Sequence, residues 1–403
     1  MNCHLCGEPL ASGIVVATSG RHGDVFTDTC CSACGLVQRA DMPSEQRLSE
    51  YYANEYRAKF KREPVRVEDG SLHEWGTPEA ERFLDENAAD YAAHIVATLG
   101  LHDALVLEVG CGDGRLARAL HRAGTQRVHA VDADERMRDE AWERGALVVG
   151  SSMGDVPIGP GIGGFDAVIS CHVLEHFADP LAALAQMRSL LRVGGRVWIE
   201  VPNLDSPYGG LSHYFQWPHL YDFTAHTLSL LLIRAGFDDV HSHDGGHVLL
   251  AYATSGESEP RSWPDALARF RQTTGADVPT GADVAARLEA YRERWQSRQR
   301  KERAVRVLQA FRGGDDSVSL AELRDAMDLL GEQSARAVRM AQRAMLDGGA
   351  IVELCDAAIS GAERYSADPY VLGMYAGEAS MAARLSHAVG NMLNAMKMLE
   401  VGA

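Results

Sequence analysis

Residues 104–134 constrain the fold of this 403-residue chain more than any other stretch. An apolar run over residues 104–109 predicts a buried parallel strand, and helical spacing follows over residues 115–123. Three glycines at alternate positions between them predict a tight loop whose backbone can pass close to a ligand. A second apolar run ends at Asp132, whose carboxylate can accept both hydroxyls of a ribose. The pattern predicts half of a nucleotide-binding βαβ unit.

The predicted loop carries negative charge that a phosphate-binding loop should avoid. Glu108 lies in the strand, Asp113 lies in the loop, and no Gly-x-x-Gly ending follows. Such a loop suits a cation, such as the sulfonium of S-adenosylmethionine (SAM), better than a pyrophosphate. The stretch resembles the first motif of the class I SAM-dependent methyltransferases, which implies a Rossmann-like α/β fold with SAM as cofactor. The residues expected beside SAM are Glu108, Gly110, Gly112, Asp113, Gly114, Asp132, Ser151, Ser152, Met153 and Cys171.

The residue after Gly150 departs from the pattern of that family. An acidic residue commonly follows this glycine in the family and helps to hold the adenine amino group, whereas this chain has Ser151. Asp155 lies a few residues too late for that role. Backbone groups near Ser152 and Met153 are therefore expected to hold the adenine.

The first 40 residues contain two Cys-x-x-Cys-Gly turns, at residues 3–7 and 31–35. Each turn can present two thiolates to one ion, and four sulfur atoms in a tetrahedron suit zinc. A structural zinc ion is therefore predicted in a module too small to bury a core of its own. Cys30 could replace Cys31, although the spacing favours Cys31, and His4 is expected in solvent. The predicted ligands are Cys3, Cys6, Cys31 and Cys34.

Composition and charge limit the class of protein. The chain is 46% hydrophobic and 24% charged, which is typical of a soluble globular protein. Its formal net charge of −17 argues against a nucleic-acid partner. No stretch is apolar enough to span a bilayer, and the N-terminus lacks the features of a signal peptide. We therefore expect a cytoplasmic location, reduced thiols and no membrane partner.

A histidine-rich segment follows the strand expected over residues 165–170. It contains His172, Glu175 and His176, at the end of a parallel strand where ligands collect. In the resembling family the same His-x-Leu-Glu-His run lies beside the methyl donor. It also resembles the Glu-x-x-Glu-His run of the ubiquinone-biosynthesis O-methyltransferases, which holds a divalent cation, with His in place of the first Glu. Three interpretations stay open: a metal site, a metal-free pocket with His172 or His176 as base, and a structural role.

Residues 206–221 are too aromatic for an ordinary solvent loop and are predicted to form a lid over the acceptor. Residues 219–224 resemble the His-x-Tyr-x-Phe-(Ser/Thr) segment before the last helix of these methyltransferases, with Thr224 as the helix cap. His219 is expected either to contact the acceptor or to fix the lid. The expected catalytic candidates are His172, His176 and His219, and the expected acceptor-binding residues are Glu175, Tyr214, Trp217 and Tyr221.

Four segments are predicted along the chain: a zinc-binding module (1–40), an aromatic and polar connecting or lid segment (41–76), a methyltransferase domain (77–254) and an all-helical domain (261–403). Residues 1–254 resemble the zinc-containing sugar C-methyltransferases, which carry an α/β domain where this chain has helical spacing. Small residues and methionines near the C-terminus indicate a bundle core or a homo-oligomer interface.

These resemblances imply methyl transfer to a small molecule or glycan, on oxygen in preference to nitrogen or carbon. Two alternatives are an RNA base methyltransferase, since some such enzymes also carry a four-cysteine module, and a non-catalytic SAM-binding scaffold whose helical region recruits a partner.

Overall fold

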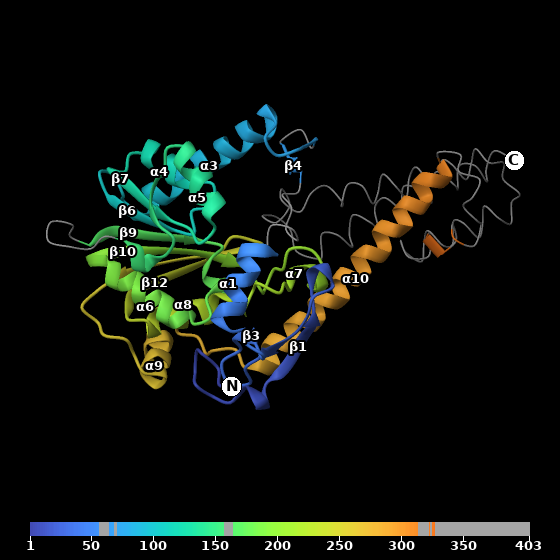
Figure 1. Cartoon of the computed structure of the whole chain (residues 1–403). Coiled ribbons are helices and arrows are strands. Elements are labelled where there is room, and N and C mark those ends of the chain that lie inside the picture. Colours follow the sequence, from blue (N-terminus) through green and yellow to red (C-terminus); the bar gives the residue numbers. More distant parts are fainter. Residues whose placement is uncertain (56–63, 68–70, 157–163, 313–321, 323–324, 327–403) are drawn as a thin grey trace, which may run out of the picture. The chain divides into compact units, whose positions relative to one another are not determined.

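The computed structural model of the chain describes residues 1–55, 64–67, 71–156, 164–312, 322 and 325–326 (Figure 1). The chain divides into two compact units, Met1–Glu289 and Ala290–Ala403. All of the predicted site residues fall within the first unit.

A seven-stranded sheet forms the centre of the first unit, in the order β12-β13-β10-β9-β6-β7-β8. The strands that run parallel to one another are β6 (Leu105–Val109), β7 (Arg127–Val131), β8 (Leu147–Gly150), β9 (Phe165–Cys171) and β10 (Leu191–Pro202). Two antiparallel strands complete one edge, β12 (Phe237–Asp244) and β13 (Val248–Ser255). The chain leaves β6 toward β7 and β8 and then returns to β9 on the other side. Ligands of open α/β sheets bind at such a switch point, beyond the carboxyl ends of the strands.

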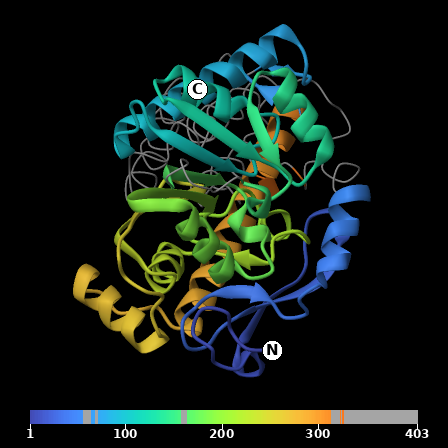
Figure 2. The ribbon, with the colours of Figure 1, turned by 60° about the vertical axis from the view of Figure 1, so that its left-hand side comes forward.

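Helices cover both faces of this sheet, as Figure 2 shows. Val106, Ile169 and Trp198 form a core on one face with α3 (Pro78–Leu99), α4 (Arg115–Arg122) and α5 (Glu135–Glu143). Leu107 and Val168 point to the opposite face, in the core that includes α6 (Pro180–Leu190) and α8 (Ala225–Arg234). The alternation follows from the period of two along a strand. It confirms the expected Rossmann-like sheet.

The helix starts follow the capping signals of the sequence. Thr77 accepts a hydrogen bond from Ala80 N at the start of α3, and Pro78 occupies the first turn. Thr224 accepts from Thr227 N at the start of α8, as expected. The caps fix where α3 and α8 begin.

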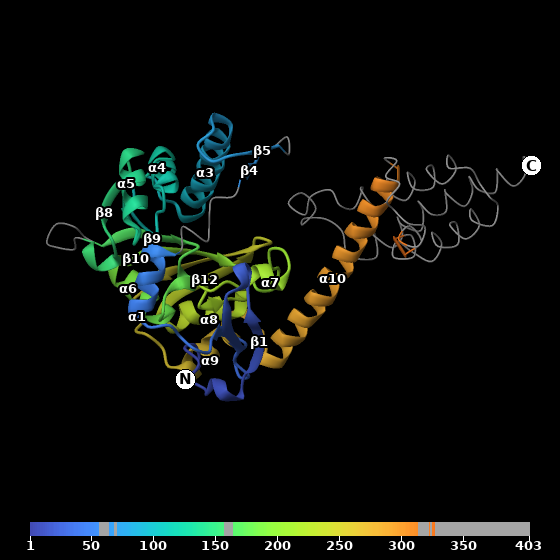
Figure 3. The same cartoon turned by 45° about the vertical axis from the view of Figure 1, so that its right-hand side comes forward.

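The N-terminal residues form a second, four-stranded sheet in the order β1-β2-β3-β11, on the side of the large sheet away from α3, α4 and α5 (Figure 3). Its strands are β1 (Ile14–Ser19), β2 (Val25–Cys30), β3 (Val37–Arg39) and β11 (Tyr221–Asp222). The first three belong to the cysteine module, whereas β11 belongs to the predicted lid. Gln38 pairs with Tyr221 and Val37 with Asp222. The cysteine module and the segment before α8 therefore share one sheet.

The remaining elements of the described chain are shorter or lie beyond the large sheet. They are η1 (Leu10–Ser12), η2 (Arg21–Gly23), α1 (Glu45–Asn54), β4 (Val65–Arg66), β5 (Leu72–His73), η3 (Met153–Asp155), η4 (Leu174–His176), α7 (Leu211–Tyr214), α9 (Trp263–Thr274) and α10 (Gly281–Arg312). Both α9 and α10 agree with the helical spacing after residue 261. The methionine-rich stretch near the C-terminus lies outside the described residues. Among the described residues, no helix combines the length and apolar composition that a bilayer span requires.

One strand was not anticipated, and one local expectation was wrong. The strand β12 was not anticipated, because its sequence, Phe-Asp-Asp-Val-His-Ser-His-Asp, is polar and it lies at an edge of the sheet. His4 is half-buried and not in solvent, because its Nδ1 lies 2.5 Å from the hydroxyl of Tyr221. That contact joins the first cysteine turn to β11.

Candidate methyl-donor and acceptor site

The glycine loop between β6 and α4 needs its glycines for different reasons. Gly110, Gly112 and Gly114 all have positive φ angles, of 76°, 53° and 73°. A Cβ atom on Gly114 would lie 2.7 Å from Cβ of Ala141, so this glycine lets α5 pack against the loop. A Cβ atom on Gly112 would meet nothing within 4 Å. The backbone at Gly112 therefore borders open space that a ligand can occupy.

Asp132 follows β7 and braces this loop. Its Oδ2 accepts a hydrogen bond from Gly112 N at 2.8 Å, and its Oδ1 accepts from Asp134 N at 2.9 Å. Its half-buried side chain therefore sits where the sequence places a ribose-binding carboxylate. The two bonds fix the carboxylate before any ligand arrives.

Glu108 is almost fully buried in β6, and its Oε2 has no hydrogen-bond partner among the described residues. Burial, together with the charges of Asp132 and Asp113, raises its pKa well above the ordinary range. The expectation of a permanent negative charge at Glu108 is therefore wrong, since its burial favours the neutral acid. A bound cation would favour ionisation.

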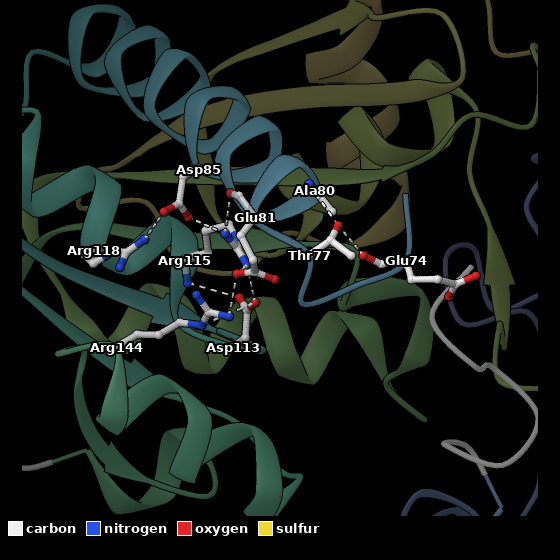
Figure 4. Close-up of polar contacts among 9 residues, drawn as sticks. All are labelled: Glu74, Thr77, Ala80, Glu81, Asp85, Asp113, Arg115, Arg118 and Arg144. Atoms are coloured by element: carbon white, nitrogen blue, oxygen red, sulfur yellow. Dashed lines mark hydrogen bonds and ion pairs between the residues drawn. The ribbon is translucent and has the colours of Figure 1, made fainter. Parts of the chain in front are cut away.

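Asp113 points into a network of arginines, which Figure 4 shows. Its Oδ2 lies 3.2 Å from Arg115 Nη2 and 3.8 Å from Arg144 Nε. Arg115 also pairs with Glu81 at 2.9 Å and contacts Asp85, both on α3. The charge of Asp113 is thus compensated by cations, and the carboxylate ties the glycine loop to α3. It is not the unopposed charge that the sequence suggested.

The loop after β8 is organised by Asp155. Its Oδ2 accepts hydrogen bonds from the backbone N and the hydroxyl of Ser151, at 2.8 and 2.9 Å, and from Ser152 N at 2.9 Å. The hydrogen bond from the Ser151 hydroxyl and the others lower the pKa of Asp155. Met153 is buried beneath this turn. Asp155 therefore reaches back to the position after Gly150, although it lies later in the sequence.

His172 follows β9 with a φ of 56°, and Glu200 of β10 lies beside it. His172 Nε2 is 2.9 Å from Glu200 Oε1, and Nδ1 is 3.8 Å from Glu175 Oε1. Burial alone would lower the pKa of His172, but its bonds to Glu175 and Glu200 raise it to about 10. The ring is 50% exposed, so solvent screens part of this attraction. The protonated form is favoured, which argues against His172 as a base.

Glu200 was missed at the sequence level, although a carboxylate inside an apolar strand, near its carboxyl end, was a usable signal. Tyr91 donates its hydroxyl to Glu200 Oε2 and accepts from Trp198 Nε1 at 3.0 Å. Cys171 lies next to these hydrogen-bonded side chains. Its burial and the charge of Glu200 raise the pKa of its thiol well above the ordinary range. Cys171 therefore stays a neutral thiol.

Glu175, His176 and His219 form the centre of the acceptor side. Neither carboxylate oxygen of the buried Glu175 has a hydrogen-bond partner among the described residues. Burial alone would raise its pKa, but the neighbouring imidazoles of His176 and His172 lower it to about 2. Burial and the neighbouring His176 lower the pKa of His219 to about 3, so His219 is neutral. Ligand atoms of Glu175, His176 and His219 all lie within 4.8 Å of one another, so these three could hold a metal ion.

Hydrogen bonding fixes the orientation of His176. Its Nδ1 is 2.8 Å from the carbonyl oxygen of Pro218, which can only accept, so Nδ1 carries a proton. In the neutral ring the lone pair is then on Nε2, 3.8 Å from Glu175 Oε1. The rings of His176 and His219 meet edge to face at 5.0 Å.

The predicted acceptor-binding aromatics have different environments. Tyr214 is buried near Glu175, and burial and the charge of Asp222 raise its pKa well above the ordinary range. Trp217 packs on Tyr51 of α1, with ring centroids 4.2 Å apart. Tyr221 is fully buried and donates to Ala178 O at 2.8 Å. Its assignment to the acceptor pocket is wrong. Its hydroxyl instead contacts His4 of the cysteine module and the carbonyl of Ala178, just before α6.

The four predicted zinc ligands converge. Cys3 Sγ lies 3.5 Å from Cys34 Sγ, and Cys6 Sγ lies 3.5 Å from Cys31 Sγ. Sulfur atoms around tetrahedral zinc, at Zn–S distances of about 2.3 Å, lie about 3.8 Å apart, so the cluster fits that ion. Cys30 Sγ instead lies 3.5 Å from the carbonyl oxygen of Gly35 and 3.7 Å from that of Gly281. Cys31, and not Cys30, belongs to the cluster.

Comparison with known proteins also identifies a methyltransferase domain in the residues of the large sheet. A family model described as a methyltransferase domain matches residues 81–242. An uncharacterised 37.1 kDa transposon protein of Streptomyces fradiae is 34% identical over 151 residues, which cover 34% of this chain and 43% of that protein. The ubiquinone biosynthesis O-methyltransferase of Xanthomonas campestris pv. campestris is 34% identical over 120 residues, covering 27% of this chain and 48% of the enzyme.

The chain thus spans about half the length, or less, of these curated relatives. Among solved structures, a 1,6-didemethyltoxoflavin-N1-methyltransferase from Burkholderia thailandensis is 28% identical, with a TM-score of 0.34, covering 44% of this chain and 82% of that one. The matched residues contain the glycine loop, Asp132 and the histidine-rich segment after β9. Residues 81–242 therefore form a methyltransferase domain with the Rossmann-like sheet of the class I SAM-dependent enzymes.

Proposed function

We propose that the protein transfers the methyl group of SAM to a small-molecule or glycan acceptor, at oxygen in preference to nitrogen or carbon. The observation that carries the proposal is His176, whose tautomer is fixed with Nε2 as the basic nitrogen, next to the anionic Glu175. Val173, three residues earlier, packs against Gly110, so this segment adjoins the donor loop. A hydroxyl acceptor must lose a proton, and a neutral imidazole can take it.

On the donor side, each group has a defined task in this proposal. The methionine part of SAM passes the open backbone at Gly112, and Asp132 accepts its ribose hydroxyls. The sulfonium charge is attracted to Asp132 and favours ionisation of the buried Glu108. SAM supplies the electrophilic methyl group, and displacement releases a neutral thioether.

On the acceptor side, catalysis rests on alignment. Because the leaving group is neutral, the protein needs little acid assistance, and holding acceptor oxygen, methyl carbon and sulfur in line supplies most of the rate. His176 receives the acceptor proton at Nε2, and Glu175 stabilises the imidazolium that forms. The nearby His172 adds a positive charge that favours a developing alkoxide.

The four-cysteine cluster is proposed to hold a structural zinc ion. All four sulfur atoms are buried and directed at one point, which leaves no position for a substrate. We therefore assign this metal no part in the chemical step.

A panel of hydroxylated, aminated and carbon acceptors with methyl-labelled SAM tests the proposal. We expect labelled product and S-adenosylhomocysteine from a hydroxylated acceptor. His176→Asn should lower the rate by about 100-fold or more while SAM affinity is kept. His121→Asn, which changes an exposed histidine on α4, is the matched control. Transfer by His176→Asn at the wild-type rate would refute the assigned base.

A divalent cation is a second candidate for activating the acceptor. Glu175, His176 and His219 bring one oxygen and two nitrogen ligands together, and the buried Glu175 oxygens have no hydrogen-bond partner among the described residues. A bound cation would acidify a coordinated hydroxyl. Removal of weakly bound cations, with zinc content held constant, separates the two routes. Loss of activity that Mg²⁺ or Mn²⁺ restores would favour the cation, and unchanged activity would favour His176 acting alone.

A further inference from the structure

Arg39, at the end of β3 in the cysteine module, has a buried guanidinium that makes four side-chain hydrogen bonds. The side chain is 1% exposed, and its Nε donates to the equally buried Asp28 at 2.7 Å. Nη1 donates to the carbonyl of Trp217 at 2.9 Å. Nη2 donates to the carbonyls of Gln216 and His219, at 3.1 and 3.0 Å. Four of the five N–H groups of the guanidinium are therefore used, three of them on one turn.

That turn, residues 216–219, carries His219 into the acceptor side of the site. The carbonyl between those held by Arg39, on Pro218, contacts His176 Nδ1 at 2.8 Å. Just after the turn, the backbone N–H of Leu220 donates to the carbonyl of Glu175 at 2.8 Å. The carbonyl of Leu220 in turn accepts from Arg39 N at 2.9 Å. Arg39 and the segment of Glu175 and His176 thus both hold the turn.

Arg39 is also close to the predicted zinc ligands along the chain. Cys34 precedes it by five residues, and the intervening backbone is fixed to the second cysteine turn, because Cys31 N donates to Leu36 O at 2.9 Å. Asp28, its partner, lies on β2, which ends at Cys30. The cysteine turns therefore set the position of β3 and hence of the guanidinium.

The donor side is braced differently. Asp132 holds Gly112, and Arg115 joins the glycine loop to α3, all within residues 78–134. These contacts do not pass through the cysteine module. A substitution of Arg39 should therefore affect the acceptor side of the site more than the donor side.

We infer that Arg39 is a positioning residue that places the 216–219 turn, and with it His219 and the orientation of His176, so that the cysteine module assembles the acceptor side of the site. This inference rests on the proposed methyl transfer for its functional consequence. A misplacement of about 1 Å in such a turn can lower a rate by about 100-fold. Lysine cannot replace Arg39, because one ammonium group cannot reach a carboxylate and three carbonyls in the planar geometry of a guanidinium.

The test compares Arg39→Lys with Arg234→Lys. Arg234 of α8 also holds the cysteine module, through the carbonyls of His4 and Leu5, but makes no described bond to the turn. We expect Arg39→Lys to lower kcat/KM for the acceptor by about 100-fold, with SAM affinity within about twofold of wild type. Arg234→Lys should change both by less than about threefold. Equal losses in the two variants, or a parallel loss of SAM affinity, would overturn the inference.

A second measurement does not depend on turnover. In the NMR spectrum of protein labelled with ¹⁵N-histidine, the ring signals of His176 and His219 should move in Arg39→Lys and stay in place in Arg234→Lys. If wild type shows no methyl transfer while these signals move as expected, the proposed function fails and the positioning role stands. If the signals are unchanged in Arg39→Lys, the positioning role fails.

Arg39→Lys leaves the buried Asp28 without its full partner, which could prevent folding. The double variant Asp28→Asn/Arg39→Gln removes both charges together and is the second protein for the same measurements. We expect the same movement of the His176 and His219 signals and the same retained SAM affinity. Wild-type signals and wild-type kcat/KM in this variant would overturn the inference.

Discussion

The glycine loop offers a prediction in which two substitutions of the same kind separate stability from ligand binding. Gly112→Ala and Gly114→Ala both place a Cβ atom on a residue with positive φ, which costs about 1–2 kcal/mol. At Gly114 the new atom would also lie 2.7 Å from Ala141 Cβ and 2.9 Å from Ala146 Cβ. Such overpacking adds about 1–3 kcal/mol. At Gly112 nothing lies within 4 Å, so no such penalty arises.

Thermal unfolding and calorimetric titration with SAM measure the two effects. Gly112→Ala should unfold a few degrees below wild type and lose at least about 10-fold in SAM affinity, because the methyl group enters space assigned to the ligand. Gly114→Ala should have the lower melting temperature of the two. Wild-type SAM affinity in Gly112→Ala would refute the placement of the donor, and equal melting temperatures would refute the packing argument.

Two further predictions concern charge and metal. Glu200→Gln should bring the pKa of His172 down from about 10, as followed by NMR titration. Since the folded-state pKa is raised, the stabilisation from the His172 charge is complete below about pH 6.5 and is lost as pH rises through about 10, so the variant should lose part of this pH dependence. An unchanged His172 titration in the variant would contradict the pairing. Removing the metal with a chelator, or substituting Cys34→Ala, should lower the melting temperature of the protein, and an unchanged melting curve would argue against a structural zinc ion.

The sequence was most informative where one residue pattern determines one local structure. The apolar runs at β6 and β7, the glycines between β6 and α4, and the cap at Thr224 all lie where they were expected. The burial of these strands, the positive φ angles of the glycines and the helix cap each depend on residues that are close in sequence. Such features need no knowledge of distant contacts.

The contacts that define the acceptor side join residues far apart in sequence, and no local pattern encodes them. Arg39 and His219 are separated by 180 residues, and His4 and Tyr221 by 217. The strand β11 is two residues long, too short for a period to be read. Tyr221 therefore looked like part of an aromatic lid when it is a buried link to the cysteine module.

Charges were the other source of error, because a sequence does not give partners or burial. Asp113 was expected to face the ligand as a free carboxylate, but Arg115 and Arg144 lie beside it. Glu108 was expected to be charged, yet its burial favours the acid. For His172, two carboxylates favour the protonated form and so argue against a role as base.

SAM binding to wild type and Asp132→Ala, measured by calorimetry, tests the central claim most directly. Asp134→Ala is the control, since it removes the cap of α5, at a cost of about 1 kcal/mol in stability, and leaves the Asp132 carboxylate in place. We predict that wild type and Asp134→Ala bind one SAM with similar affinity and that Asp132→Ala binds it about 10- to 100-fold more weakly. Absence of SAM binding by wild type, or undiminished binding by Asp132→Ala, would contradict the account.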